Sequence, residues 1–233
     1  MKLNRFFGEY NLDKKIIYIT ELNIVHQIRN VLRLKVGERL VLCDGTLKEA
    51  VIEILDFKKN LVKAKVIDVY ENRNEPKVSV SLYCSILKRD NFELVCQKAC
   101  EIGVSEIVPL LTKRTVKLSL KYERLKKIVK EASEQSGRGK VPVINKARKY
   151  TDEIKTKKDL LNIFFDEKGE DIDSLKTNNI QNIGIWIGPE GGWTVDELNL
   201  ASKYNAKIFK LGDLTLRSET AAIIASYIIL NKF

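Results

Sequence analysis

Three glycines, a proline and one carboxylate make up the five residues from Gly188 to Gly192, GPEGG. They follow the apolar run Ile183–Ile187, which is typical of a buried strand, and they precede a helix start. A phosphate-binding loop at this place would keep free N–H groups and add a lysine or serine, and it would not contain Glu190. A carboxylate beside bare backbone instead suits a cationic or hydroxyl-rich ligand, and the sulfonium and ribose of S-adenosylmethionine fit that description. A glycine-rich turn that only packs a strand against a helix is the alternative.

The helix that follows this loop is predicted to bond its own N-terminal N–H groups. Thr194 is a favourable N-cap residue, and Glu197 three positions later completes a capping box. Trp193 before the cap and Leu198 in the first turn are placed to form a hydrophobic staple. Because the first N–H groups are then partly bonded within the helix, we expect this terminus to be a poor phosphate site.

A second group of chemically active residues lies near the C-terminus, in the motif LRSET. Arg217, Glu219 and Thr220 come directly before a stretch that is apolar on nearly all sides, from Ala221 to Leu230. Such a helix must be buried over most of its surface, and unpaired polar groups at its mouth would be costly. The sequence therefore predicts a ligand pocket here or, as the alternative, an Arg–Glu pair that caps the helix.

The chain of 233 residues carries a net charge of +10, and the positive charge is concentrated in its middle. Residues 75–150 contain 17 Lys and Arg against 8 Asp and Glu, whereas residues 151–233 contain 10 against 13. A basic tract binds polyanions by releasing counterions, and its shortage of apolar anchors favours nucleic acid over a membrane surface. A solvated helix face without a partner is the alternative.

Composition limits the class of protein further. Four cysteines without a disulfide-framework spacing and a single histidine, His26, argue against a zinc site, so no metal is expected. Cys96 and Cys100, one helical turn apart, are predicted to be small buried thiols. No apolar run approaches the roughly 18 residues of a membrane span, and the N-terminus lacks the apolar region of a secretory signal. We therefore expect a soluble, cytoplasmic, metal-free protein.

Hydrophobic patterning divides the chain into two regions. Up to residue 69, short strands and tight turns surround one helix over residues 21–34, which predicts a small β-barrel. From residue 78, apolar strands alternate with helices, which predicts an α/β fold with a parallel sheet and ligands beyond the carboxyl ends of its strands. The polar stretch Glu71–Pro76 separates the regions, so the predicted domains are residues 1–73 and 74–233.

IGPEGGWTVDEL, followed about twenty residues later by LGDLTLRSETAA, resembles the SPOUT superfamily of methyltransferases. The specific resemblance is to the family that methylates N3 of a uridine in small-subunit (16S) ribosomal RNA, RsmE. It extends over nearly the whole chain, through NRFF at 4–7, HQIRNVLRLKVGERLVLCDG at 26–45, QKACEIGVSEIVPLLTKRTV at 97–116 and EASEQSGRGKVPVI at 131–144. GPEGG alone is moderately specific, whereas its combination with the LGxxxLRxET pattern and the N-terminal VLR motif is highly specific. One departure is Gln27, where the family often has a histidine.

The resemblance implies a PUA-like RNA-binding β-barrel followed by a SPOUT domain with a C-terminal trefoil knot. It also implies S-adenosylmethionine as cofactor and a homodimer. Carried over position by position, it assigns cofactor contacts to three segments of this chain. The residues are Phe165; Gly188, Pro189, Glu190, Gly191 and Gly192; and Leu211, Gly212, Leu216, Arg217 and Thr220.

The chemistry of N3 methylation suggests the remaining roles. Uracil N3 must lose its proton as the methyl group approaches, so most of the enzyme's contribution is proximity and electrostatics. Arg217 is the predicted catalytic cation near O2 or O4, and Glu219 is the predicted proton acceptor or orienting group, with Glu190 as the alternative. Basic residues of the matched motifs are predicted to hold RNA: Arg5, Arg33, Lys88, Arg114 and Arg138. Two other functions stay open, a SPOUT enzyme acting on another RNA and a non-catalytic RNA-binding ribosome-assembly protein.

Overall fold

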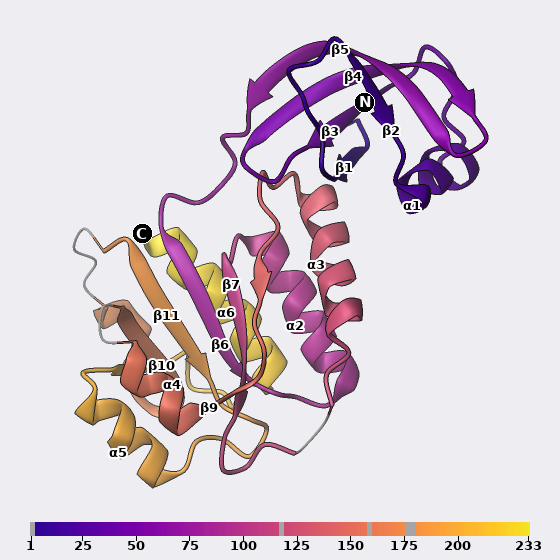
Figure 1. Ribbon diagram of the computed structural model, residues 1–233. Coiled ribbons are helices and arrows are strands. Elements are labelled where there is room, and N and C mark those ends of the chain that lie inside the picture. The colour runs from indigo at the N-terminus through magenta and orange to yellow at the C-terminus, as the bar shows by residue number, and fades with distance from the viewer. Residues whose placement is uncertain (1–2, 117–118, 158–159, 176–179) are drawn as a thin grey trace. The chain divides into compact units, whose positions relative to one another are not determined.

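The computed structural model describes residues 3–116, 119–157, 160–175 and 180–233, which fall into two compact units (Figure 1). The N-terminal unit comprises the chain up to Glu75 together with residues 133–141, and the C-terminal unit comprises residues 76–132 and 142–233. Helix α3 (Tyr122–Ser136) runs through this division, so its last turn groups with the N-terminal unit. The sequence patterns did not foresee that residues 133–141 would belong there.

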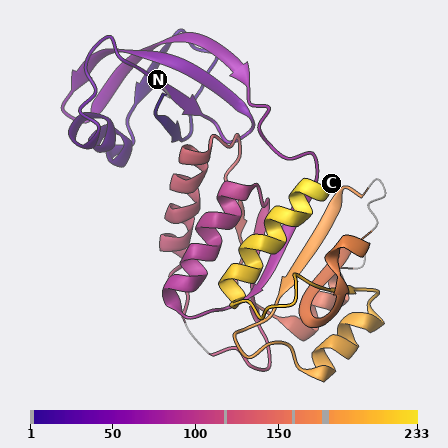
Figure 2. The same cartoon turned by 180° about the vertical axis from the view of Figure 1, so that it is seen from behind.

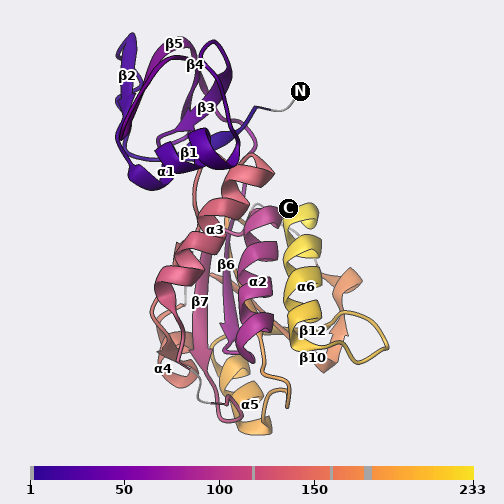
Figure 3. The ribbon, with the colours of Figure 1, turned by 90° about the vertical axis from the view of Figure 1, so that its right-hand side faces the viewer.

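The N-terminal unit is a five-stranded sheet that curls around an apolar core (Figure 3). Its strand order is β1-β3-β4-β5-β2, with β1 parallel to β3 and all other neighbours antiparallel. Register shifts within the β4–β5 pair mark bulges, which bend the two long strands. The strands are β1 (Arg5–Phe7), β2 (Ile16–Ile19), β3 (Arg39–Cys43), β4 (Lys48–Lys58) and β5 (Leu61–Glu71).

The predicted helix of this unit is present as α1 (Leu22–His26), continued by the π-helical turn η1 (Gln27–Val31). The segment ends where Arg33 adopts a φ of 54°, in the left-handed region, and the N–H of Leu34 donates to the carbonyl of Ile28 (3.0 Å). Only glycine adopts this conformation without strain, and for another residue the cost is about 1 kcal/mol.

The C-terminal unit is built on a seven-stranded sheet, and the predicted parallel arrangement is confirmed. The order is β12-β10-β11-β6-β7-β8, with β9 also paired to β7, and each of these pairings is parallel. The carboxyl ends of neighbouring strands therefore meet at one edge of the sheet. The strands are β6 (Ser79–Ser85), β7 (Glu106–Leu111), β8 (Val143–Ile144), β9 (Arg148–Lys149), β10 (Leu161–Asp171), β11 (Asn182–Ile187) and β12 (Lys207–Lys210).

Helices cover both faces of this sheet. On one face lie α2 (Arg89–Ile102), α3 and α6 (Ser218–Lys232), with α6 packed against α2, β6 and β11 (Figure 2). Helices α4 (Tyr150–Thr156) and α5 (Val195–Lys203) share a buried cluster with side chains of the other face. A single turn of 3₁₀ helix, η2 (Ile172–Ser174), follows β10.

That cluster contains an aromatic ladder across three neighbouring strands. Tyr83, Trp186 and Phe164 are fully buried and stack in register, with ring centroids 4.1 Å apart for the first pair and 5.0 Å for the second. Stacked aromatic pairs prefer one lateral arrangement, so the ladder fixes the register of β6, β11 and β10. The last paired residues of the second two strands, Ile187 and Phe165, are thereby aligned at the sheet edge.

The cysteines and the apolar helices add two observations. All four cysteines are buried thiols outside any disulfide, so the predicted burial of Cys96 and Cys100 is confirmed. In the parts of the chain that the structure describes, no helix is both long and apolar enough to cross a membrane.

Candidate functional site

One cavity of the C-terminal unit lies where the carboxyl ends of β10, β11 and β12 meet. Its volume is about 560 Å³, which is in the range of small-molecule sites. Three strand-end loops form most of its wall, and the first turns of α5 and α6 complete it. The lining residues are 165–168, 187–193 and 210–216, with Arg114, Val195, Leu198, Ser218 and Ala221.

The GPEGG loop forms one wall with almost no side chains. The N–H of Gly192 donates to the carbonyl of Pro189 (2.8 Å), which closes a tight turn, and Gly192 itself has a φ of 68° that favours glycine. A Cβ on Gly188 would stand 3.2 Å from the indole of Trp193. That indole donates to the carbonyl of Phe165 (3.2 Å), so the loop is tied to the end of the neighbouring strand.

The predicted capping box at the start of α5 is confirmed. Thr194 accepts from the N–H of Glu197 (3.4 Å), and Glu197 Oε2 accepts from the N–H of Thr194 (2.8 Å). The other oxygen, Glu197 Oε1, accepts from the N–H of Lys113 (2.9 Å). The helix terminus is thus bonded within the protein, which disfavours a phosphate site here.

Strand β10 makes an excursion that the sequence analysis missed. Phe165 and Glu170 both lie opposite Phe209 of β12, so the four residues between them leave the ladder. Gly169 returns the chain so close to β12 that a Cβ would stand 2.4 Å from the backbone of Phe209. The excursion brings Asp166, Glu167 and Lys168 to the cavity wall, and the N–H of Lys168 donates to Asp166 (3.1 Å). The signal for it was the run DEKG after an apolar strand.

Only some residues of the third predicted segment, residues 211–220, line the cavity. Leu211, Gly212, Leu216 and Ser218 line the cavity, but Arg217, Glu219 and Thr220 do not. Successive helical residues point about 100° apart, which is why Ser218 and Glu219 face different surroundings.

Arg217 and Glu219, the two predicted catalytic residues, have contrasting environments. Arg217 is an exposed N-cap residue without a side-chain cap bond, and among the described residues no ion pair joins it to Glu219. Glu219 is 9 % exposed, and its Oε2 has no hydrogen-bond partner among the described residues. The helix cap formed by an Arg–Glu pair, which was the structural alternative, is therefore absent from this part of the described chain.

Nine of the eleven residues predicted to contact the cofactor thus border one cavity, and Arg217 and Thr220 are the two outside it. Glu190 has a second task, because its Oε1 accepts from the N–H of Lys88 (3.3 Å), the N-cap residue of α2. Both Glu190 and Glu219 act on the thiol of Cys84, whose pKa is raised well above its usual value by burial and further by the charges of Cys96 and these two carboxylates.

The ionisable side chains of the cavity give it a slight excess of negative charge. Four carboxylates line it against three cations, and one of those cations, Lys210, pairs with Asp213 (2.6 Å). The Lys210 hydrogen bond and charge lower the pKa of Asp213, so this pair is ionised and its charges offset each other. What remains is Asp166, Glu167 and Glu190 against Lys168 and Arg114, an arrangement suited to a cationic ligand.

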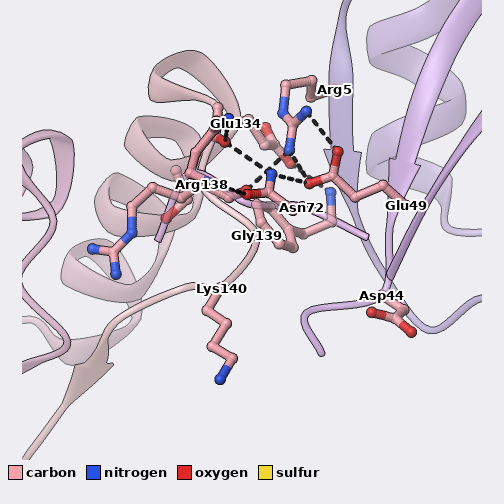
Figure 4. Close-up of polar contacts among 12 residues, drawn as sticks. Arg5, Asp44, Glu49, Asn72, Glu134, Arg138, Gly139 and Lys140 are labelled. Atoms are coloured by element: carbon pink, nitrogen blue, oxygen red, sulfur yellow. Dashed lines mark hydrogen bonds and ion pairs between the residues drawn. The ribbon is translucent and has the colours of Figure 1, made fainter. Parts of the chain in front are cut away.

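Two of the five predicted RNA-contacting residues lie in a buried network of the N-terminal unit (Figure 4). The guanidinium of Arg5 donates to both oxygens of Glu49, which is fully buried, and to the carbonyl of Arg138 (3.0 Å). The Arg138 side chain donates to Glu75 (2.7 Å), whose Oε1 also accepts from the N–H of Gly139 (2.9 Å). These placements favour structural roles for Arg5 and Arg138 over the predicted RNA contacts.

The other three predicted RNA contacts have different surroundings. Arg33 and Lys88 are exposed, the first on the N-terminal unit and the second at the start of α2. Arg114 is exposed as well, but it borders the cavity and donates to the carbonyl of Gly191. Among the described residues no group of three or more His, Cys, Asp or Glu side chains could hold a metal ion.

Comparison with known proteins gives consistent matches over the length of the chain. Residues 73–230 match the model of the RNA methyltransferase domain. Ribosomal RNA small subunit methyltransferase E of Rickettsia conorii is 36 % identical over 232 residues, covering 97 % of this chain and 94 % of the relative. The same enzyme of Neisseria gonorrhoeae, solved bound to S-adenosyl methionine, matches the structure with a TM-score of 0.92 at 27 % identity, over 100 % of this chain and 98 % of that one. A putative methyltransferase of Legionella pneumophila, solved with bound SAM, matches with a TM-score of 0.88 at 28 % identity and the same coverage. With a family match over most of its residues and relatives of this kind, the chain belongs to the RNA methyltransferase family that includes ribosomal RNA small subunit methyltransferase E.

Proposed function

We propose that this protein transfers a methyl group from S-adenosylmethionine to N3 of a uridine in small-subunit ribosomal RNA, in the cytoplasm. The observation that carries the proposal is the cavity at the ends of β10, β11 and β12, where bare glycine backbone meets an excess of carboxylates. The relatives named ribosomal RNA small subunit methyltransferase E, one of them bound to S-adenosyl methionine, support the same reaction here.

The residues of the cavity fit this cofactor. A volume of about 560 Å³ suits a nucleoside joined to an amino acid, and most of such a ligand would be enclosed. Exposed backbone at Gly191 and Gly212 would bond the adenine edge, and Asp166 and Glu167 would attract ribose hydroxyls and the positive sulfur. When bound, S-adenosylmethionine supplies an electrophilic methyl group.

The protein's own groups would then position uracil and remove its N3 proton. Glu219 has a buried carboxylate oxygen without a partner among the described residues, and it remains the proposed proton acceptor or orienting group, with Glu190 as the alternative. A cation beside O2 or O4 would stabilise the negative charge that develops on the base. The sequence assigns that part to Arg217, which does not itself line the cavity although its chain neighbours Leu216 and Ser218 do.

RNA binding is assigned to the N-terminal unit, as a PUA-like barrel over residues 1–73, and to exposed cations of the methyltransferase domain, residues 74–233. The curled sheet of the N-terminal unit supports the assignment of a barrel. Arg33, Lys88 and Arg114 are exposed and would contact phosphates or bases. Binding through such contacts weakens steeply with salt. It releases counterions from the RNA, and this release is less favourable when the salt concentration of the solution is higher.

The proposal includes a homodimer and a knotted chain. Helix α6 is apolar on nearly all sides, yet Tyr227 is 59 % exposed, and Leu214 before it is 84 % exposed. Apolar surface of this kind usually meets a partner chain, and a second copy is the simplest partner. After edge strand β12 the chain returns to the middle of the sheet, where α6 packs against β6 and β11. This path supports a knotted chain. Sedimentation equilibrium tests the dimer, and a monomer at micromolar concentration would contradict it.

Mapping methylated nucleotides in ribosomal RNA tests the function directly. RNA from a strain that lacks the gene is digested and compared by mass spectrometry with RNA from the complemented strain. We expect one N3-methyluridine of the small-subunit RNA to be missing and then restored. Loss of a methyl group from another RNA or from a ribose would instead indicate a different substrate. Unchanged RNA, together with no S-adenosylmethionine binding in calorimetry, would indicate a non-catalytic assembly protein.

A further inference from the structure

A short turn after β7 carries Arg114 to the cavity. The N–H of Thr112 donates to Thr115 Oγ1 (2.9 Å), and the two hydroxyl oxygens lie 2.7 Å apart. The N–H of Thr115 donates back to the carbonyl of Thr112 (3.3 Å). These bonds close residues 112–115, which we name the threonine turn, on themselves. The conformation of the turn is therefore set before any ligand binds.

The threonine turn is bonded to the start of α5 through one buried carboxylate. Glu197 is 6 % exposed; its Oε1 accepts from the N–H of Lys113 (2.9 Å), and its Oε2 accepts from the N–H and hydroxyl of Thr194 (2.8 and 2.9 Å). Hydrogen bonds to a buried, ionised carboxylate are among the stronger ones in proteins. The turn, the helix cap and the GPEGG loop that leads into the cap thus form one rigid piece.

Arg114 lies directly on the GPEGG loop. Its Nη1 donates to the carbonyl of Gly191, and a Cβ on Gly191 would stand 3.2 Å from Arg114 Cδ. A guanidinium has five N–H donors in a fixed fork, and a neutral carbonyl does not compensate its charge. Among the described residues Arg114 bonds the carbonyl of Gly191 and no carboxylate, and its side chain is part of the cavity lining. A cation that is oriented by this bond and has no ion-pair partner among the described residues therefore borders the cavity in which the cofactor would be held.

Arg217 lacks these properties. It is the N-cap residue of α6, its side chain makes no cap bond, and it does not line the cavity. Nothing on the described chain fixes its direction, so part of any interaction with a substrate would be lost to ordering a long side chain.

From these contacts we infer that Arg114 is a catalytic residue, the cation that stabilises the negative charge developing on uracil. The inference rests on the proposed function. In the reaction, N3 gives its proton to a carboxylate or to water, and the electron pair left on nitrogen forms the bond to the methyl carbon. The bond between that carbon and sulfur breaks, its electron pair stays on sulfur, and the sulfonium becomes a neutral thioether. While N3 is deprotonated, its negative charge is shared with O2 and O4, and the fixed guanidinium donates to one of these oxygens without reorganising.

The first test compares Arg114→Gln with the unchanged protein and with Lys207→Gln. Lys207 is an exposed cation at the amino end of β12, and the cavity lies at the carboxyl ends of the strands, so this control removes the same charge away from the site. The substrate is small subunits from a strain that lacks the gene. We expect kcat of Arg114→Gln to fall by about 100-fold, as for the loss of one oxyanion donor, while the Kd for S-adenosylmethionine measured by calorimetry is unchanged.

The pH dependence of kcat separates this role from simple RNA binding. Without the cation N3 is harder to deprotonate, so the kcat of Arg114→Gln should keep rising at pH values where that of the unchanged protein has levelled off. Subunits reconstituted from RNA transcribed with 5-fluorouridine, whose N3–H is more acidic, should restore most of the lost kcat. Arg114→Lys keeps the charge but loses the fork, and we expect it to have an intermediate kcat with the original pH profile.

Other results would overturn the inference. A raised KM for the subunit and a weaker salt dependence, with kcat and its pH profile unchanged, would make Arg114 an RNA-phosphate contact. A loss of S-adenosylmethionine affinity would make it part of the cofactor pocket. Failure of the unchanged protein to methylate any uridine N3 would instead contradict the proposed function. The assay of the unchanged protein therefore tests the proposed function separately from the role of Arg114.

Discussion

Arginines in two regions of the molecule are held in opposite ways. In the N-terminal unit, the side chains of Arg5 and Arg138 are only 9 % and 6 % exposed, and each faces a carboxylate. In the C-terminal unit, Arg114 is exposed and bonds only a neutral carbonyl among the described residues. A guanidinium that is paired with a carboxylate stabilises the fold, whereas a guanidinium without a charged partner can still bind an anion. The partner, rather than the motif in which an arginine occurs, distinguishes the two uses.

We expect the largest effect on stability when the Arg5–Glu49 ion pair is broken. Arg5→Met leaves the carboxylate of Glu49, which is fully buried, without its cation, and this should lower the free energy of unfolding by about 3 kcal/mol. Amide hydrogen exchange in β4 measures the loss in the N-terminal unit. The matched control, Arg5→Met with Glu49→Leu, removes both charges and should recover most of the stability. A stable Arg5→Met protein with weaker RNA binding would return Arg5 to the predicted RNA contact.

At Gly191, substitutions of two sizes separate the uncompensated cation from the cofactor wall. Alanine adds a Cβ that would stand 3.2 Å from the Arg114 stem, so Gly191→Ala should displace that side chain and lower turnover with little change in S-adenosylmethionine affinity. Gly191→Val adds a Cβ and two methyl groups at the exposed backbone, and we expect its affinity to fall at least about 10-fold, or about 1.4 kcal/mol. Calorimetry measures both affinities. Normal binding by the folded valine variant would show that this loop is structural only.

The Arg138 pair can be tested through pH. Burial raises the pKa of Glu75, but the hydrogen bond and charge of Arg138 and the N–H groups of Gly139 and Lys140 outweigh this and hold the pKa below its usual 4.5. A carboxyl whose pKa is lower in the folded state contributes stability above its unfolded pKa and loses it as pH falls through the folded pKa. Glu75→Gln should therefore cost about 1 kcal/mol at pH 7, and thermal unfolding should show the difference shrinking below about pH 4. A difference that is constant with pH would contradict this.

Arg33 is expected to show the smallest effect on stability. Its φ of 54° suits glycine, so the strain relieved in Arg33→Gly offsets the added freedom of the unfolded chain, and stability should change by less than about 0.5 kcal/mol. If Arg33 contacts a phosphate, the slope of log affinity against log salt should fall by about 1. Asn205→Gly makes the same backbone change at a φ of 58° without loss of charge, and its RNA affinity should be unchanged. Equal RNA binding by both variants would remove Arg33 from the RNA surface.

Local patterns in the sequence were enough for much of the fold and for part of the site. The parallel sheet follows from apolar strands alternating with helices, and the capping box follows from a threonine and a glutamate three positions apart. The resemblance named nine residues that border one cavity. These inferences depend on neighbours in sequence or on a family motif, so they need no knowledge of tertiary packing.

What the sequence did not reveal depends on partners that are distant along the chain. The β10 excursion requires Gly169 to meet the backbone of Phe209, and the use of Arg5 requires Glu49. Arg114 and Gly191 are 77 positions apart, and nothing in the pattern of either segment indicates the contact. Residue types predict which charges a protein has, whereas only packing determines which of them are compensated.

The two tryptophans of the chain differ in a way that can be read optically. Trp186 is sealed within the aromatic ladder, where neither solvent nor a collisional quencher reaches its ring. Trp193 lines the cavity beneath Gly188, with its indole bonded to the carbonyl of Phe165. We therefore expect a ligand that enters the cavity to change the fluorescence of Trp193 more than that of Trp186. The protein carries an intrinsic fluorophore in the wall of its own site, so occupancy can be followed in real time without a dye.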